Sequence, residues 1–245
     1  MFIRNDKDKQ ALRDSGRILH DVIAGVAQAS FPGVNLLELD ELAGRLVKSL
    51  GAMCCFRGYK GFPANICLSV NDAVVHGIPY DYVLRPGDIL GIDMGVLYDD
   101  VITDSAITIG IGSITPEREA FLTTTKEALS KAIAIVKHGI RVGDIGATVQ
   151  AHVESKGYGI VRELTGHGVG RALHEDPHIP NYGTRGTGPT LRAGEVIAIE
   201  PITTMGKYAI YVDNDDWTIR TRDRSLGAQF EHTLVITDNG AEVVT

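Results

Sequence analysis

Apolar residues recur at helical spacing in four stretches of the chain, which are separated by shorter runs of a different period. The four stretches cover residues 6–29, 36–50, 116–138 and 144–156. Asn35, with Glu38 three residues later, predicts a capping box at the start of the second helix. Thr115 and Pro116 predict the start of the third helix, and Gly139 predicts its end. The pattern therefore predicts four helices.

Between the helices lie eight short runs that are typical of strands. They cover residues 65–70, 74–78, 88–97, 101–110, 158–165, 195–204, 208–212 and 228–237. Strands and helices do not alternate strictly, as they would in a doubly wound parallel sheet. We therefore predict an α+β fold with a largely antiparallel sheet.

The chain contains an internal repeat. Residues 84–93 read LRPGDILGID and residues 191–200 read LRAGEVIAIE. Both segments combine Leu-Arg-x-Gly, an acidic residue and an apolar run that ends in a carboxylate. Upstream of them, Gly33 and Gly139 occupy corresponding places, and each is followed by a predicted helix. Chance similarity between turn–strand segments is the alternative, but two matches at nearly equal offset favour a repeat.

The repeat predicts two related halves, about 1–112 and 113–245, which together form one catalytic domain over residues 1–245. In this interpretation Asp93 and Glu200 occupy equivalent positions, each at the end of an apolar strand. A carboxylate at both positions suggests that the two halves contribute to one site.

Composition and charge exclude several classes of function. The chain has 245 residues, of which 44% are hydrophobic and 22% charged, as in a globular protein with a substantial core. The formal net charge is −7 without a basic block, so nucleic acid and anionic membranes have no electrostatic support as partners. No run reaches the length of a transmembrane helix, and the first residues lack the apolar core of a signal peptide. The three cysteines show no CxxC spacing and predict reduced thiols in a cytoplasmic protein.

Residues 91–110, GIDMGVLYDDVITDSAITIG, are typical of a β-hairpin. If Tyr98 and Asp99 form a two-residue turn, Asp93 and Asp104 lie directly opposite each other, with Cβ atoms about 4.5–5.5 Å apart. Like charges so placed destabilise a sheet unless a cation lies between them, and a metal ion would meet this need. The alternative is that one aspartate faces solvent in a register shifted by one residue.

Two further carboxylates and a histidine strengthen the metal interpretation. Glu200 ends the apolar run EVIAIE, and Glu231 lies within AQFEHTLVIT, where an unpaired buried carboxylate would cost several kcal/mol. His167 lies in TGHGVG, whose glycines disfavour a helix. Carboxylate oxygens with one imidazole suit two divalent ions of Mn, Fe, Co or Zn, about 3.5–4 Å apart.

Four segments together resemble the type I methionine aminopeptidases, which have the pita-bread fold and belong to peptidase family M24: IDMG…TDSA, GHGVGRALHEDP, IAIEP and QFEHTLVIT. The resemblance covers essentially the whole chain, with the motifs in order. It implies two halves related by a pseudo-twofold axis and a curved antiparallel sheet covered by helices. It also assigns five metal ligands: Asp93, Asp104, His167, Glu200 and Glu231.

The resemblance implies metal-dependent removal of the N-terminal (initiator) methionine from nascent proteins and peptides with a small second residue. Hydroxide held by the metal ions would attack the first peptide bond. Glu200 would shuttle protons as well as bind metal, while His76 and His174 would bind the substrate and stabilise the tetrahedral intermediate. A purely structural role is the alternative for each histidine.

The resemblance also implies an apolar pocket for the methionine side chain. Its residues would be Tyr59, Phe62, Cys67, His76 and Trp217. Ordinary core packing is the alternative for Trp217, the only tryptophan. Two positions depart from the pattern of the bacterial members, because Phe56 stands where a cysteine is common and Leu173 where an aromatic residue is common. These departures affect the shape of the pocket rather than the reaction.

Other proteins of the same scaffold are the alternatives. Xaa-Pro aminopeptidases and prolidases resemble the same ligand set but carry a sizeable extra N-terminal domain, for which the segment before the first motif is too short. Type II methionine aminopeptidases carry a helical insertion, for which residues 175–199 leave no room. Eukaryotic type I members carry a zinc-binding extension, so the short bacterial type fits best. A binding module would have lost ligands, and a paralogue with other substrates stays open because of Phe56 and Leu173.

The partners that follow are nascent polypeptide N-termini that begin with methionine, and the ribosome surface is a further candidate. Neither nucleic acid nor a membrane is expected as a partner. We expect a monomer, since the resembling family is usually monomeric and no apolar stripe argues otherwise.

Overall fold

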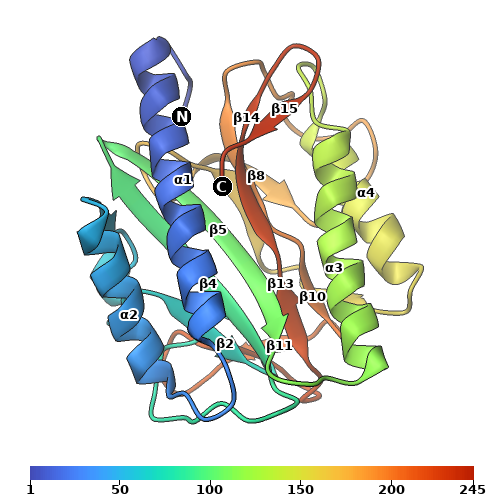
Figure 1. The fold of residues 1–245 in the computed structure, drawn as a ribbon. Coiled ribbons are helices and arrows are strands. Elements are labelled where there is room, and N and C mark those ends of the chain that lie inside the picture. Colours follow the sequence, from blue (N-terminus) through green and yellow to red (C-terminus); the bar gives the residue numbers. More distant parts are fainter.

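The computed structural model describes residues 1–245 and contains four α-helices, which lie in two pairs outside a curved sheet (Figure 1). Their bounds are α1 Asp6–Ala29, α2 Leu36–Ser49, α3 Pro116–Ala134 and α4 Val142–Glu154. The four predicted helices are confirmed, with ends that differ by a few residues. None of them combines the length and the apolar character that crossing a bilayer requires.

The start of α2 corrects one prediction. The side chain of Asn35 accepts a hydrogen bond from the backbone N–H of Leu37 at 2.9 Å, as an N-cap residue does. The predicted capping box is wrong, because Glu38 is exposed and does not bond back to Asn35. The carboxamide of Asn35 is instead held by Asp81, whose Oδ1 accepts from Nδ2 at 2.7 Å.

The start of α3 agrees with the sequence, but its end does not. Thr115 is the N-cap residue and Pro116 occupies the first turn, as predicted. The helix ends at Ala134 rather than next to Gly139. The reason is that the backbone N–H of His138 donates to the carbonyl of Thr237 at 3.0 Å, which draws this segment away from the helix axis.

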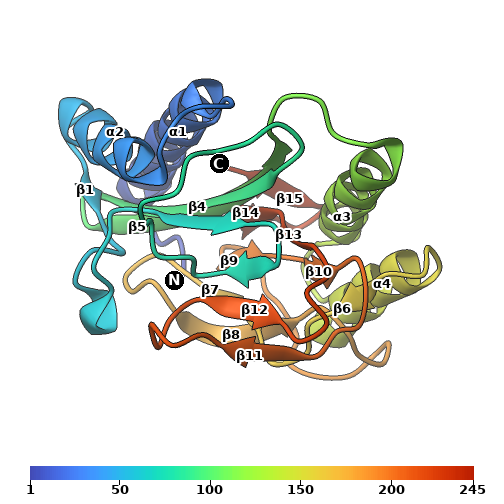
Figure 2. The ribbon, with the colours of Figure 1, turned by 90° about the horizontal axis from the view of Figure 1, so that it is seen from below.

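The main sheet has nine strands, and each paired strand is antiparallel to its neighbour (Figure 2). Its order is β1-β4-β5-β14-β9-β7-β8, with β2 beside β4 and β15 beside β14. The bounds are β1 Met53–Cys54, β2 Cys67–Val70, β4 Ile89–Tyr98, β5 Val101–Gly110, β7 Thr165–Gly168, β8 Glu175–Pro180, β9 Val196–Ile199, β14 Glu231–Ile236 and β15 Ala241–Val243. The predicted α+β class with an antiparallel sheet is therefore confirmed. Strand β14, which is late in the sequence, joins β5 to β9 in the middle of the sheet.

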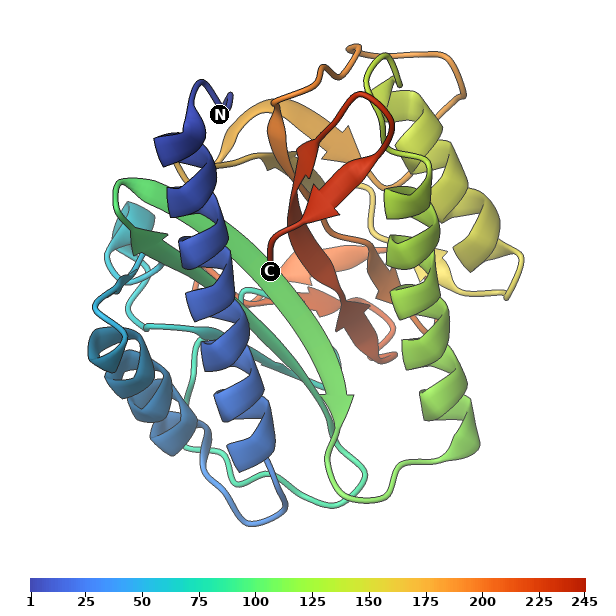
Figure 3. The same cartoon turned by 45° about the horizontal axis from the view of Figure 1, so that its top comes forward.

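Two apolar cores lie between the helices and the sheet (Figure 3). Under α1 and α2, buried residues such as Leu19, Leu39 and Ile92 form one core. Under α3 and α4, Phe121 and Leu234 belong to the other. Each buried side chain of this size stabilises the fold by about 1.5–3 kcal/mol. The two helix pairs therefore hold one face of the sheet and leave the opposite face for the site.

Two small three-stranded sheets lie beside the main one: β13-β10-β6 and β11-β12-β3. Their bounds are β3 Ala73–Val75, β6 Gly159–Ile160, β10 Ile202–Thr204, β11 Ile210–Val212, β12 Ile219–Thr221 and β13 Gly227–Gln229. The predicted strands 158–165, 195–204 and 228–237 are each divided, because the chain passes from one sheet to the other within them. Two of these breaks place Glu200 after β9 and Glu231 at the first position of β14.

The internal repeat is visible in the backbone hydrogen bonds. The N–H of Gly33 donates to the carbonyl of Leu84 at 2.8 Å, and the N–H of Gly139 donates to the carbonyl of Leu191 at 2.9 Å. Both glycines have positive φ, at 100° and 87°, which other residues rarely adopt. The same loop is thus closed in the same way before α2 and before α4, in keeping with pseudo-twofold related halves.

Candidate metal centre

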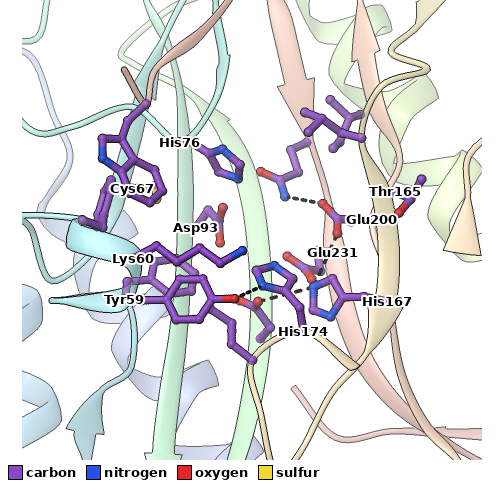
Figure 4. Close-up of a pocket in the computed structure, with 18 residues that line it drawn as sticks. Tyr59, Lys60, Cys67, His76, Asp93, Thr165, His167, His174, Glu200 and Glu231 are labelled. Atoms are coloured by element: carbon purple, nitrogen blue, oxygen red, sulfur yellow. Dashed lines mark hydrogen bonds and ion pairs between the residues drawn. The ribbon is translucent and has the colours of Figure 1, made fainter. Parts of the chain in front are cut away.

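Five buried side chains from five separate segments face one pocket on the inner side of the sheet (Figure 4). They are Asp93 of β4, Asp104 of β5, His167 of β7, Glu200 after β9 and Glu231 of β14. The structure thus brings together all five residues that the sequence suggested as metal ligands. The first two come from the first half of the chain and the other three from the second.

The hairpin β4–β5 places its two aspartates by a register that differs from the predicted one. Asp99 and Asp100 form the turn, so Asp93 lies opposite Ala106 and Asp104 lies opposite Gly95. The prediction that the two aspartates are directly opposite is wrong. Their side chains still share one face as diagonal neighbours, because moving the turn by one residue shifts the pairing by two.

The cluster leaves carboxylate oxygens without partners. Ligand atoms of Asp104, His167 and Glu231 lie within 4.8 Å of one another. Nε2 of His167 is 3.6 Å from Oε1 of Glu200 and 3.8 Å from Oδ2 of Asp104. Oδ1 of Asp93, Oδ1 of Asp104 and Oε1 of Glu231 are buried and accept no hydrogen bond. Buried acceptors in this number indicate a site built for a cation.

The electrostatics of the carboxylates point the same way. Burial raises the pKa of Asp104 to about 7. Burial, followed by repulsion from the neighbouring carboxylates, raises the pKa values of Asp93, Glu200 and Glu231 well above their usual range. Without a cation, ionised carboxylates here are therefore unfavourable, whereas a divalent ion would reverse this cost.

His167 is held in the form that binds a metal. Its Nδ1 donates to the carbonyl of Gly168 at 2.8 Å, which leaves the lone pair of Nε2 facing the carboxylates. Burial lowers the pKa of His167 to about 4, so the ring is neutral near pH 7. A neutral ring cannot offset the carboxylates by its own charge. The donor set of carboxylates and one neutral imidazole fits a divalent metal.

Glycines beside His167 allow three strands to approach one another closely. A Cβ atom on Gly166 would collide with the carbonyl of Ala198 in β9, and one on Gly168 would collide with that of Asp176 in β8. These glycines therefore let β7 lie between its neighbours with His167 directed at the cluster. At each of the two positions, only glycine leaves room for the neighbouring strand.

His174 lies beside this cluster, in the segment that returns from β7 to β8. Its Nδ1 is 2.8 Å from the hydroxyl of Tyr59, and its ring meets that of His167 edge-on at 4.4 Å between centroids. The segment is fastened by Glu175, whose Oε1 accepts from the N–H groups of Arg171 and Ala172. His174 thus faces the open side of the pocket in a fixed orientation.

His76 reaches the pocket from the opposite wall. Its backbone has φ of 57°, a strained value for a residue other than glycine, and the next residue is fixed by a bond from Gly77 N–H to Ser69 Oγ at 3.1 Å. The ring makes no hydrogen bond within the protein and lines the pocket. Burial lowers its pKa to about 4.

An apolar compartment adjoins the carboxylates. The cavity has a volume of about 200 Å³, and its apolar wall includes the predicted residues Phe62, Cys67 and Trp217. Phe62 meets Trp217 edge-on at 5.1 Å between ring centroids. The remaining apolar side chains of this wall are Phe56, Leu164, Leu173 and Ile202. The structure therefore places all of the predicted substrate residues on one pocket, with Phe56 and Leu173 among them.

The sequence analysis missed five residues that line the pocket: Lys60, Leu164, Thr165, Ile202 and Gln229. Gln229 donates from Nε2 to Oε2 of Glu200 at 3.1 Å and so orients that carboxylate. Gln229 lies two residues before Glu231 in the motif QFEH, and this position is the sequence feature that could have indicated it. Lys60 lines the pocket between two glycines in GYKGF, a pattern that carries no chemical signal of its own.

Comparison with known proteins agrees with this site. The sequence model of metallopeptidase family M24 matches residues 10–238. A methionine aminopeptidase of Clostridium acetobutylicum is 42% identical over 246 residues, which cover 100% of this chain and 98% of that protein. The crystal structure of methionine aminopeptidase from Thermotoga maritima superposes with a TM-score of 0.97 at 40% identity, covering 100% of this chain and 99% of that one.

A more distant structure has the same fold. Prolidase from Pyrococcus furiosus superposes with a TM-score of 0.81 at 24% identity, and this chain spans 65% of its length. The predicted pita-bread fold and the predicted resemblance to bacterial type I methionine aminopeptidases are both confirmed. By its match over nearly the whole length, the chain belongs to metallopeptidase family M24.

Proposed function

We propose that this protein is a methionine aminopeptidase, which removes the N-terminal methionine from peptides and nascent proteins with a small second residue. One observation carries the proposal: a cluster of buried, unpartnered carboxylates and a neutral histidine lies at the inner end of an apolar pocket. The full-length similarity to methionine aminopeptidases supports the same activity.

The ligand set that we propose is Asp93, Asp104, His167, Glu200 and Glu231, holding two divalent ions. Three observations support this set: the unpaired carboxylate oxygens, the raised pKa values of the carboxyl groups, and the lone pair of His167 Nε2 that faces them. Mn, Fe, Co or Zn match these donors. When bound, such ions supply an activated water and polarise the scissile carbonyl.

The side chains of the chain itself orient the substrate and move protons. Glu200 takes up the proton of the attacking water and delivers it to the leaving amine, while Gln229 holds one of its oxygens in place. His174, oriented by Tyr59, and His76 from the opposite wall donate hydrogen bonds to the oxygen that gains charge. Preorganised donors of this kind contribute about 10²–10³-fold each.

Specificity for methionine follows from the shape of the pocket. Phe62, Cys67 and Trp217 form an apolar compartment that suits a flexible thioether, and sulfur packs favourably against aromatic edges. Tyr59 and His76 line the same pocket. A pocket of about 200 Å³ that ends at buried carboxylates suits the end of a chain, as exopeptidase activity demands.

We further propose that residues 1–245 act as a single catalytic domain. Its substrates are the methionine-bearing N-termini of nascent chains, in the cytoplasm, and the enzyme works as a monomer that meets these chains at the ribosome surface. The acidic net charge of −7 supports peptides rather than nucleic acid as substrates.

A peptide panel tests the proposed function. Chelator-treated protein, with and without added Mn²⁺, Fe²⁺ or Co²⁺, is incubated with peptides that begin Met-Gly, Met-Ala, Met-Phe or Ala-Pro, and free amino acids are measured. We expect metal-dependent release of methionine from the first two peptides only. Asp104→Asn should abolish it, and Asp100→Asn in the exposed turn should not. Cleavage of Ala-Pro instead would contradict the proposal and indicate a proline-specific enzyme.

A further inference from the structure

The mouth of the pocket is marked by two side chains. Eighteen residues line the pocket, and of these only Lys60 and His174 are exposed (Figure 4). If the methionine side chain enters the apolar compartment and its carbonyl lies at the carboxylates, the rest of the substrate leaves past these two residues. Lys60 therefore faces the residues that follow the cleaved bond. The placement of the substrate beside Lys60 rests on the proposed function.

The backbone fixes the position of Lys60. The residue lies in the short 3₁₀ turn Tyr59–Gly61, with φ of 47° and ψ of 25°, a left-handed conformation that is uncommon for lysine. Gly58 and Gly61 on either side also have positive φ. The N–H of Gly58 donates to the carbonyl of Phe62 at 2.8 Å and closes the turn. The same turn carries Tyr59 and Phe62 into the pocket, so the backbone position of Lys60 is fixed relative to both.

The ammonium group of Lys60 has no carboxylate partner. Its Nζ lies 5.3 Å from the ring centroid of Tyr59, and it forms none of the salt bridges in the structure. Its side chain extends across the pocket toward His174 (Figure 4). The positive charge is near enough to His174 to help lower the pKa of that histidine, after burial. A protein of net charge −7 thus holds an unpaired cation at the entrance of its site.

We propose that Lys60 is a specificity-determining residue, which binds a carboxylate carried by the substrate just beyond the cleaved bond. That carboxylate has two sources. One is an acidic side chain at the third residue, since the second residue must be small. The other is the C-terminal carboxylate of a short peptide.

The chemistry of lysine sets the size of the effect. An ammonium group on a flexible stem recognises charge rather than shape, and it stays hydrated at an exposed position. Exposed ion pairs change an equilibrium by at most about fivefold, and salt screens them. We therefore expect a preference for acidic substrates of about fivefold at low ionic strength, which falls toward one at about 0.5 M salt.

The experiment compares matched peptides on the manganese-loaded protein. One arm sets Met-Ala-Asp-amide against Met-Ala-Asn-amide, and the other sets Met-Ala-Ala against its amide. The ratio of kcat/KM within each pair is measured for the wild type, Lys60→Met, Lys60→Arg and Lys48→Met. Lys48 is exposed in the last turn of α2 and does not line the pocket, so its variant controls for net charge.

We expect a ratio above one in at least one arm, and the arm that shows it identifies the source of the carboxylate. Lys60→Met should lose the preference, while Lys60→Arg and Lys48→Met should keep it. A ratio of one in both arms, or a preference that survives in Lys60→Met, overturns the inference.

A binding measurement separates this inference from the proposed function. Trp217 is the only tryptophan and lines the pocket, so its fluorescence reports occupancy by a peptide. If no peptide releases methionine, the proposed function fails, and titration with the same pairs then decides the role of Lys60. Tighter binding of the acidic peptide by the wild type but not by Lys60→Met supports the inference, and equal binding contradicts it.

Discussion

Asp104→Asn should stabilise the metal-free protein above neutral pH and destabilise the metal-loaded one. Burial raises the pKa of Asp104 to about 7 from an ordinary value of 3.8. The folded metal-free protein therefore keeps a proton that the unfolded chain releases at lower pH. The cost of this group is absent below about pH 4, grows as the pH rises, and is complete above pH 7.

The magnitude follows from this difference in pKa. At about 1.36 kcal/mol for each pH unit, ionised Asp104 costs the metal-free fold roughly 4 kcal/mol. For a chain of 245 residues, this amounts to roughly 10 °C in Tm. His76 and His167, whose pKa values burial lowers to about 4, titrate with the opposite sign below pH 6.5. The informative quantity is therefore the difference between wild type and variant, in which His76 cancels, and at pH 8 both histidines are neutral and add nothing.

Differential scanning calorimetry of chelator-treated protein at pH 4.5, 6 and 8 gives this difference. We expect wild type and Asp104→Asn to unfold at similar temperatures at pH 4.5, and the variant to be the more stable at pH 8. Added Mn²⁺ should reverse the order at pH 8, because the wild type binds the ion more tightly. Asp99→Asn, in the exposed turn of the same hairpin, should follow the wild type throughout. If the difference in Tm between metal-free wild type and Asp104→Asn is the same at pH 4.5 and at pH 8, the reasoning is refuted.

Three further predictions concern the walls of the site. His174→Ala should lower kcat about 10²-fold with unchanged metal content by atomic absorption, and loss of the metal instead would assign His174 to the ligands. Trp217→Ala should lower kcat/KM for Met-Ala peptides about 10–200-fold through loss of the apolar wall, and an unchanged value would place methionine elsewhere. Gly95→Ala should cost about 1–3 kcal/mol in chemical denaturation, because its Cβ would overlap Sγ of Cys55 and the ring of Phe56; unchanged stability would show that this wall yields.

Helices and strands of this chain were predictable where one periodicity extends over many residues. The helix over 6–29 and the hairpin strands are examples, since their apolar positions face a core on one side. The five candidate ligands could be selected because a carboxylate in an apolar strand has a high cost unless it has a partner. That reasoning concerns single positions and needs no coordinates.

Register and long-range partners were harder to predict. The hairpin turns at Asp99 and Asp100, whose φ values of 45° and 60° show that both adopt the left-handed conformation that a tight hairpin turn demands. A turn at Tyr98-Asp99 fitted the sequence equally well, because either turn leaves Asp93 and Asp104 on the same face of the hairpin. Gln229 bonds to Glu200, 29 residues away, so only its place beside Glu231 in QFEH could have marked it, and no local pattern marks Lys60.

The central position of β14 has a consequence for the synthesis of the protein. A ribosome delivers the chain from its N-terminus, so β5 and β9 both emerge before the strand that joins them. Until residues 231–236 emerge, each has an unpaired edge that can recruit strands of other chains. The same late strand brings Glu231, without which the cluster lacks a carboxylate. Closure of the sheet and assembly of the metal cluster therefore both wait for residues 231–236, and a product truncated before them has neither.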